Sequence, residues 1–187
     1  MNKKEEYSTL TGMKVIRSRL GHEKIMANYF TVNEKHLKKW TPSVPKGHHS
    51  VESWQRRLGE RELEFESGLS AYFIGTDDAE SHVIGNCSLS NMVRGVFQAC
   101  HMGYSIAEQY QGQGYMKKIV SHAIGYAFND MKLHRIMANH MADNERSAAL
   151  LKRLGFEKEG YAKEYLSING QWEDHILNAL LNKNYRR

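Results

Sequence analysis

The sequence has few prolines, few cysteines and no long hydrophobic run. Both prolines, Pro42 and Pro45, fall in the stretch TPSVPKGHHS, which predicts irregular structure there. Cys87 and Cys100 show no metal-ligand spacing and lie in apolar, strand-like surroundings, so we expect buried free thiols in a reducing cytoplasm. No apolar run approaches the roughly 20 residues that a membrane helix needs, and the start of the chain lacks the apolar core of a signal peptide. These absences predict a cytoplasmic protein without a membrane partner.

The charge pattern also excludes several classes of function. The formal net charge is +5, which favours an anionic ligand, but no lysine- or arginine-rich tract indicates sequence-specific binding of nucleic acid. Ten histidines are present, yet none pairs with a cysteine or forms the spacing of a zinc helix, so we expect no metal. With 187 residues, 41% hydrophobic and 25% charged, the chain has the size of a single domain, 1–187, with a core at about 10–181.

Hydrophobic periodicity predicts strands and helices that alternate in the second half of the chain. The clearest pattern is an apolar stripe at helical spacing along 116–128, and Asn169-Gly170 has the composition of a tight hairpin turn. We predict strands at 13–20, 71–76, 82–89, 96–106, 135–141, 161–168 and 172–181, and helices at 22–31, 34–40, 51–66, 116–128 and 144–154. This order favours an α/β fold (α+β, mixed sheet), with strands running in both directions.

A glycine-rich loop, EQYQGQGYMKK, lies between a predicted strand and the clearest predicted helix. The first residues of a helix leave backbone N–H groups unpaired, and they carry a partial positive charge that favours an anion. Gly112 and Gly114 permit backbone angles that turn successive amides toward one point, which suits a pyrophosphate. The loop lacks the Gly-Lys-Ser/Thr of a Walker loop, and Lys117 stands at the third glycine of a dinucleotide fingerprint. A plain tight turn is the alternative.

Two spaced motifs make the chain resemble the GNAT superfamily of acetyl-CoA-dependent N-acetyltransferases. The first is Gln109-x-x-Gly112-x-Gly114 between strand and helix, and the second is Asn144-x-x-Ser147 at the start of a helix that closes in LGF. The resemblance spans roughly 10–181. The stretches NMVRGVFQACHMGYSI, HRIMANHM and GFEKEGYAKEYLSINGQWEDH resemble in particular the RimJ-type ribosomal-protein-alanine N-acetyltransferases.

This resemblance implies a GNAT-like acyl-CoA N-acyltransferase fold whose central, mostly antiparallel sheet is splayed at the cofactor site. It implies acetyl-CoA as the acetyl donor. The strand before the loop then offers its backbone to the pantetheine arm, and one N–H near 102–104 polarises the thioester carbonyl. Asn144 contacts the donor from the far side. The residues implied for the arm are Tyr104, Ser105 and Ile106, and those implied for the pyrophosphate are the amides of Gln111, Gly112, Gln113, Gly114, Tyr115 and Met116.

The sequence departs from the family pattern at two catalytic positions. His101 stands where many relatives have a glutamate base, and it either takes the amine's proton or merely packs in its strand. Leu151 stands where many relatives have a tyrosine acid, which leaves Ser147 or solvent water to protonate the thiolate. Direct attack of the amine is favoured over an acetyl-cysteine route, because no base is evident beside Cys100.

The acceptor side is implied by the RimJ-type resemblance. We expect acetylation of the N-terminal α-amino group, with alanine first, of a small-subunit ribosomal protein, and an association with the ribosome or pre-ribosome. Trp40, Tyr165 and Trp172 are the predicted acceptor contacts, with rim packing as their alternative. Two other functions stay open: a GNAT enzyme for a small-molecule amine, and an acetyl-CoA-binding, ribosome-associated assembly factor.

Overall fold

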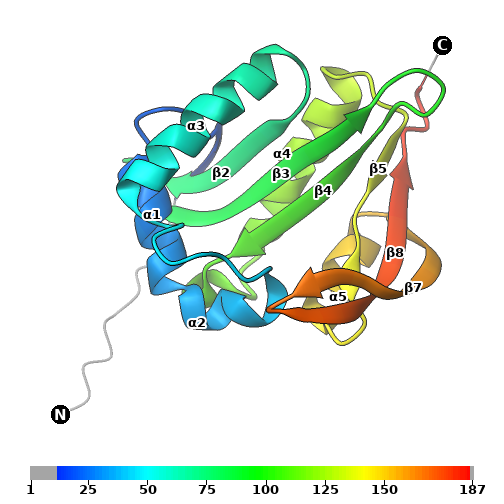
Figure 1. Cartoon of the computed structure of the whole chain (residues 1–187). Coiled ribbons are helices and arrows are strands. Elements are labelled where there is room, and N and C mark those ends of the chain that lie inside the picture. The colour runs from blue at the N-terminus through cyan, green and yellow to red at the C-terminus, as the bar shows by residue number, and fades with distance from the viewer. Residues whose placement is uncertain (1–11, 186–187) are drawn as a thin grey trace.

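The computed structural model describes residues 12–185 (Figure 1). The strands are β1 (Met13–Arg17), β2 (Ala71–Asp77), β3 (Val83–Val93), β4 (Ala99–Ile106), β5 (Arg135–Met137), β6 (His140–Met141), β7 (Glu157–Ile168) and β8 (Gln171–Leu181). The helices are α1 (Glu23–Val32), α2 (Glu34–Leu37), α3 (Val51–Glu66), α4 (Tyr115–Asn129) and α5 (Glu145–Arg153), with 3₁₀ turns η1 (Lys38–Trp40) and η2 (Glu108–Tyr110).

The eight strands form one sheet of mixed direction. Its order is β1-β2-β3-β4-β5-β8-β6, and β7 pairs with β8 outside this path. β4 and β5 pair in parallel, while the other pairs among the described strands are antiparallel. The predicted mixed, mostly antiparallel sheet is therefore confirmed.

Helices cover both faces of the sheet (Figure 1). The apolar stripe of α4 packs on one face together with Leu151 of α5, and α1, α2 and α3 pack on the other face. Ile119 of α4 is fully buried, and it comes so close to β2 that a Cβ added at Gly75 would lie 2.5 Å from its Cδ1. The sheet can approach α4 this closely because glycine has no side chain.

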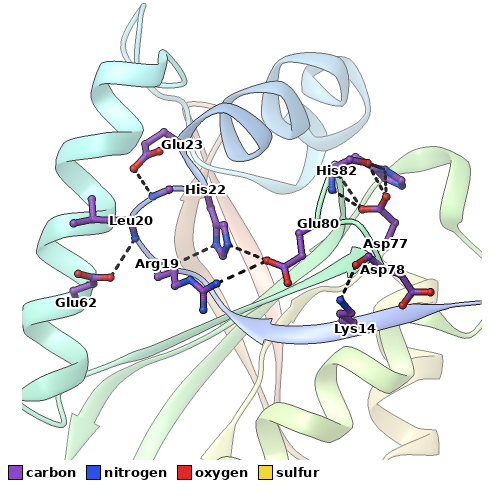
Figure 2. Close-up of polar contacts among 12 residues, drawn as sticks. Lys14, Arg19, Leu20, His22, Glu23, Glu62, Asp77, Asp78, Glu80 and His82 are labelled. Carbon is purple, nitrogen blue, oxygen red and sulfur yellow. Dashed lines mark hydrogen bonds and ion pairs between the residues drawn. The ribbon is translucent and has the colours of Figure 1, made fainter.

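Polar contacts fix the start of α1 over the β2–β3 side of the sheet (Figure 2). Arg19 and His22 lie 3.9 and 3.7 Å from the carboxylate of Glu80, which belongs to the β2–β3 turn. The Leu20 N–H donates to Glu62 of α3 at 3.2 Å. Burial lowers the pKa of His22. These contacts join the start of α1, α3 and the β2–β3 turn at one point, while the buried apolar cluster of α1, α3 and β2 holds the helices on the sheet.

The structure differs from the predicted elements mainly at strand boundaries. The single strand expected at 135–141 breaks into β5 and β6, because the Ala138 N–H turns to donate to the Asn178 carbonyl of β8 and Asn139 accepts from the Asn178 N–H. β4 begins at Ala99 rather than at residue 96, since Gln98 has a positive φ of 45° in the preceding turn. The hairpin turn is as predicted, with positive φ at Asn169 and Gly170. In the described part of the chain, no helix has the length and apolarity to cross a membrane.

Candidate functional site

The sheet opens between β4 and β5. β4 has eight residues, but it pairs with β5 only from Ala99 to His101. β5 ends at Met137, after which the chain turns toward β8, so the rest of β4 has no strand partner on this side within residues 12–185. The predicted splay therefore begins directly after His101.

Hydrogen bonds on the two sides of β4 show which residues face this gap. The Ala107 N–H donates to the Ile84 carbonyl of β3 at 2.9 Å, and the Gln98 carbonyl accepts from the Arg135 N–H at the start of β5. Backbone polar groups alternate between the two sides of a strand, so both observations turn Tyr104 and Ile106 toward the gap. Ser105, the third residue predicted to serve there, has its backbone turned to β3. Its side chain instead bonds to Tyr29 and Asn86.

The glycine loop lies beyond the end of β4 and leads into α4. Gly112 and Gly114 have positive φ values of 75° and 83°, and a Cβ added at either would meet no atom within 4 Å. Across the described residues, the N–H groups of Gly112, Gln113, Gly114 and Met116 donate to no protein acceptor. Open space and unpaired amides at a helix start are the requirements of an anion site.

Side chains brace this loop. Gln111 Nε2 lies 2.9 Å from His36 Nε2 of α2, and Gln113 Nε2 donates to the Gln109 carbonyl at 2.8 Å. The side chains of Tyr115 and Met116 are buried, so only their backbone faces outward at the start of α4. The sequence motif thus predicted a loop whose amides, rather than side chains, are available.

His101 lies at the vertex of the splay. It is the last residue of β4 that pairs with β5, and it lies across from Ser90 of β3. By strand alternation its side chain shares the face of Ser105, which contacts α1, and not the face of Met102, which packs toward α4. Its Nδ1 is buried without a hydrogen-bond partner in the described chain, and burial lowers its pKa. A neutral imidazole can accept a proton near neutral pH.

Tyr104 and Ser147 meet on the opposite face of the sheet. The two hydroxyls lie 2.6 Å apart, and Asn144 caps α5 by accepting from the Ser147 N–H at 3.1 Å. Burial raises the pKa of Tyr104 to about 12. The sequence motif indicates Ser147 and Asn144 as candidates, whereas the contact of the Tyr104 phenol with Ser147 depends on the fold.

Leu151 and Cys100 argue against two alternative mechanisms, a tyrosine acid on α5 and an acetyl-cysteine intermediate. Leu151, at the position of the family's tyrosine acid, is 1% exposed and belongs to the core on the α4 side. Cys100 is a buried free thiol whose pKa burial raises to about 12. A buried thiol with a raised pKa is a poor nucleophile, which favours direct transfer.

The predicted acceptor residues lie around the tip of the β7–β8 hairpin. The Asn169 N–H donates to the Thr41 carbonyl at 3.1 Å, which joins the tip to the segment after Trp40. The Tyr165 hydroxyl accepts from Asn139 Nδ2 at 3.3 Å. Trp172 is 66% exposed and lines a hollow of about 390 Å³ with several acidic side chains, so it does not pack in the core.

Sequence reasoning missed a polar strip on the front of the sheet, which is the face covered by α1, α2 and α3. Asn86, Ser88 and Ser90 alternate with Cys87 and Leu89 along β3, and this period of two was the available signal. Asn86 Nδ2 donates to Ser105 Oγ at 2.8 Å, and the Tyr29 hydroxyl lies 2.8 Å from the same atom. The strip gives the face that carries His101 a hydrogen-bonding surface.

Comparison with known families gives this geometry a name. The model of the acetyltransferase (GNAT) domain matches residues 19–157, most of the chain. The chain belongs to the GNAT family. Among curated GNAT proteins, it is 47% identical over 155 residues to the [ribosomal protein uS5]-alanine N-acetyltransferase of Escherichia coli (strain K12), with 83% of this chain and 80% of that protein covered.

Solved GNAT structures agree with the fold. The ribosomal-protein-S5-alanine acetyltransferase of Vibrio fischeri is similar with a TM-score of 0.91 and 40% identity, covering 94% of this chain and 96% of that one. Mycobacterium smegmatis RimJ in complex with CoA-disulfide is similar with a TM-score of 0.85 and 25% identity, covering 94% of this chain and 84% of that one. The expected GNAT fold and the RimJ-type resemblance are confirmed.

Proposed function

We propose that this protein transfers the acetyl group of acetyl-CoA to the N-terminal α-amino group, on alanine, of a small-subunit ribosomal protein. The observation that carries the proposal is the free edge of β4, which opens toward the unpaired amides of the glycine loop. The acceptor is supported by the 47% identity to a uS5-alanine N-acetyltransferase. The reaction takes place in the cytoplasm, in association with the ribosome or pre-ribosome.

Backbone groups hold the donor. The gap-facing groups of Tyr104 and Ile106 are free to pair with the amide-containing pantetheine arm, and the loop amides from Gly112 to Met116 receive the pyrophosphate. The Gln111 N–H, also predicted for this role, instead donates to the Glu108 carbonyl at 3.2 Å. The side-chain oxygen of Asn144 is engaged with the Ser147 N–H, so Asn144 contributes mainly by fixing the start of α5 beside the gap. The RimJ neighbour in complex with CoA-disulfide supports this class of donor.

The amine reaches the thioester from the face that carries His101. A protein α-amino group has a pKa near 8, so a neutral histidine suffices to take its proton, directly or through one water. By the alternation of β4, the N–H groups of Met102 and Tyr104 point into the gap, where they can donate to the developing oxyanion. The enzyme otherwise contributes by bringing amine and thioester together.

The thiolate leaves toward α5, on the other face. Either hydroxyl of the Tyr104–Ser147 pair can donate to the other. With Tyr104 as the donor, the serine's own proton is free to point at the sulfur. Base and leaving-group partner thus lie on opposite faces of β4, with the reacting carbonyl in the gap between them.

The test uses purified protein, acetyl-CoA and ribosomal protein uS5 in unacetylated form, with intact mass as the readout. We expect the mass of one acetyl group on the N-terminal residue, and much less product with Gly114→Val when acetyl-CoA is kept below its wild-type KM. Spermidine, offered in the same assay, should remain unmodified. Modification of spermidine but not of uS5 would favour the small-molecule function. Binding of acetyl-CoA and of ribosomal particles with no acetylated product would favour the assembly factor.

A further inference from the structure

A second cavity lies between α3 and the front of the sheet, outside the gap that faces the glycine loop. It is partly open and has a volume of about 60 Å³. Its floor includes Asn86 and Ser88 of β3, which lie across from Ser105 and Gly103 of β4. The cavity therefore adjoins the face of the sheet from which the acceptor amine approaches. Its polar lining residues are Ser18, Trp54, Arg61, Tyr72, Asn86 and Ser88.

Two of these residues carry buried polar atoms without a partner. Trp54 and Ser18 are 1% and 3% exposed, and neither Trp54 Nε1 nor Ser18 Oγ makes a hydrogen bond within the described chain. Leaving such an atom without a hydrogen bond costs about 1–3 kcal/mol, so we expect a bound group in the cavity to pair with it. Since an indole N–H can only donate, that group must offer a hydrogen-bond acceptor.

Arg61 adds a positive charge to the same cavity. Its guanidinium lies 3.8 Å from the ring centre of Tyr72 and 5.2 Å from that of Trp54, and burial lowers its pKa. No carboxylate of the described residues lies within 4.0 Å of its nitrogens. The nearby carboxylate of Glu64 is engaged by Ser70 Oγ at 2.6 Å and by the Tyr72 hydroxyl at 3.3 Å. The negative charge of Glu64 still acts on Arg61 from beyond this distance. A mostly buried guanidinium with no carboxylate in direct contact retains N–H donors for a further anion.

We propose that this cavity binds a carboxylate, supplied by an acidic side chain close to the acceptor's N-terminus. The inference rests on the proposed function for the peptide nature of the acceptor. Ordered waters, of which the volume holds about two, would satisfy Trp54 and Ser18 but would give Arg61 no anionic partner in direct contact. A carboxylate does both, because its two oxygens accept from the guanidinium and from the neutral donors together. The cavity thereby selects acceptors by a residue beyond the acetylated one.

The experiment compares peptides that begin with alanine and carry either Glu or Gln at one position from the second to the sixth. In the wild-type protein we expect kcat/KM to be about tenfold higher for Glu than for Gln at one of these positions, as a charge-assisted hydrogen bond provides. Arg61→Gln should abolish this preference, Arg61→Lys should retain part of it, and Trp54→Phe should weaken it. The KM for acetyl-CoA should stay close to wild type in all three variants, and the melting temperature should stay close to wild type in the two Arg61 variants. Trp54→Phe shortens a buried ring, so its melting temperature should fall.

Arg57→Gln is the matched control. Arg57 lies one helical turn earlier, 3.6 Å from the ring centre of Trp54, and donates to the His48 carbonyl, but it does not line the cavity. It should keep the Glu preference. An equal preference in Arg61→Gln and in wild type would overturn the inference.

A second arm separates a peptide carboxylate from a free one. Acetate is added alone, and the melting temperature is measured for wild type and Arg61→Gln. Stabilisation of wild type only, with no Glu preference at any peptide position, would assign the cavity to a free carboxylate. No stabilisation together with no Glu preference would refute a carboxylate site. Failure of the wild type to acetylate any alanine peptide would count against the proposed function, while the acetate arm would still decide on the cavity.

Discussion

The contact between Tyr104 and Ser147 gives the sharpest prediction about the chemistry. We consider Ser147→Ala, Tyr104→Phe and the double variant. If Ser147 donates a hydrogen bond to the leaving sulfur and Tyr104 only orients the serine, Ser147→Ala should cause most of the decrease in the rate of acetyl transfer. The loss of the phenol should cost less, and the double variant should resemble Ser147→Ala.

The magnitude follows from the acidity of the groups. Burial raises the pKa of Tyr104 to about 12, whereas an ordinary thiol has a pKa of about 8.5. Complete transfer of the tyrosine proton to the thiolate is therefore uphill by about 3.5 pH units, or ~5 kcal/mol. The pair cannot act as a strong acid, and it contributes a hydrogen bond to a charged sulfur, about 1.5–3 kcal/mol. We expect Ser147→Ala to slow acetyl transfer about 10- to 100-fold and Tyr104→Phe about 3- to 10-fold.

The assay is single-turnover acetyl transfer, so that product release does not mask the chemical step. Tyr126→Phe serves as the control, because this tyrosine of α4 packs its ring against Phe65 and Phe73 away from Ser147. Its rate should match wild type. Additive losses in the double variant would refute the orienting role of Tyr104. An unchanged rate in Ser147→Ala would remove the serine from the mechanism, and a loss far beyond 100-fold would make it an obligatory proton donor.

Three further predictions follow from the site. Because burial lowers the pKa of His101, kcat/KM should fall as the pH drops through that lowered value, where the imidazole becomes protonated. His101→Gln should lose this inflection, and an unchanged pH profile would assign the residue to packing. Gly114→Val forces a side chain onto a φ of 83° and should raise the KM for acetyl-CoA at least tenfold, while Gly125→Ala within α4 should leave it unchanged. Equal KM values for Gly114→Val and wild type would disprove anion binding by the glycine loop. Trp172→Ala should raise the KM for the acceptor about 3- to 10-fold without affecting acetyl-CoA, and a normal acceptor KM would leave Trp172 as surface packing.

Much of the geometry of the glycine loop and of α4 was readable from the sequence because its signals are local. Gly112 and Gly114 sit where positive φ is needed, and the stripe of α4 has an unbroken helical period. The break between β5 and β6 was not readable, since it depends on Asn178 of a distant strand, which takes the Ala138 N–H. Local patterns predict an element, but a long-range hydrogen bond decides where it ends.

The cavity that we propose for a carboxylate of the acceptor was harder to predict for the same reason. The cavity between α3 and the sheet is lined by Ser18 after β1, by Trp54 and Arg61 of α3, and by residues of β3. Each of these residues reads alone as an ordinary polar or aromatic position, and only the fold brings them together. The pairing of Tyr104 with Ser147 likewise joins residues 43 positions apart in the chain.

The central claim is tested most directly by the intact masses of the ribosomal proteins of cells with and without this gene, and of deleted cells that carry wild type or Gly114→Val. The account predicts that one small-subunit protein with an N-terminal alanine loses one acetyl group on deletion. Wild type should restore it and Gly114→Val should not. Identical masses for every ribosomal protein in all four strains would contradict the account.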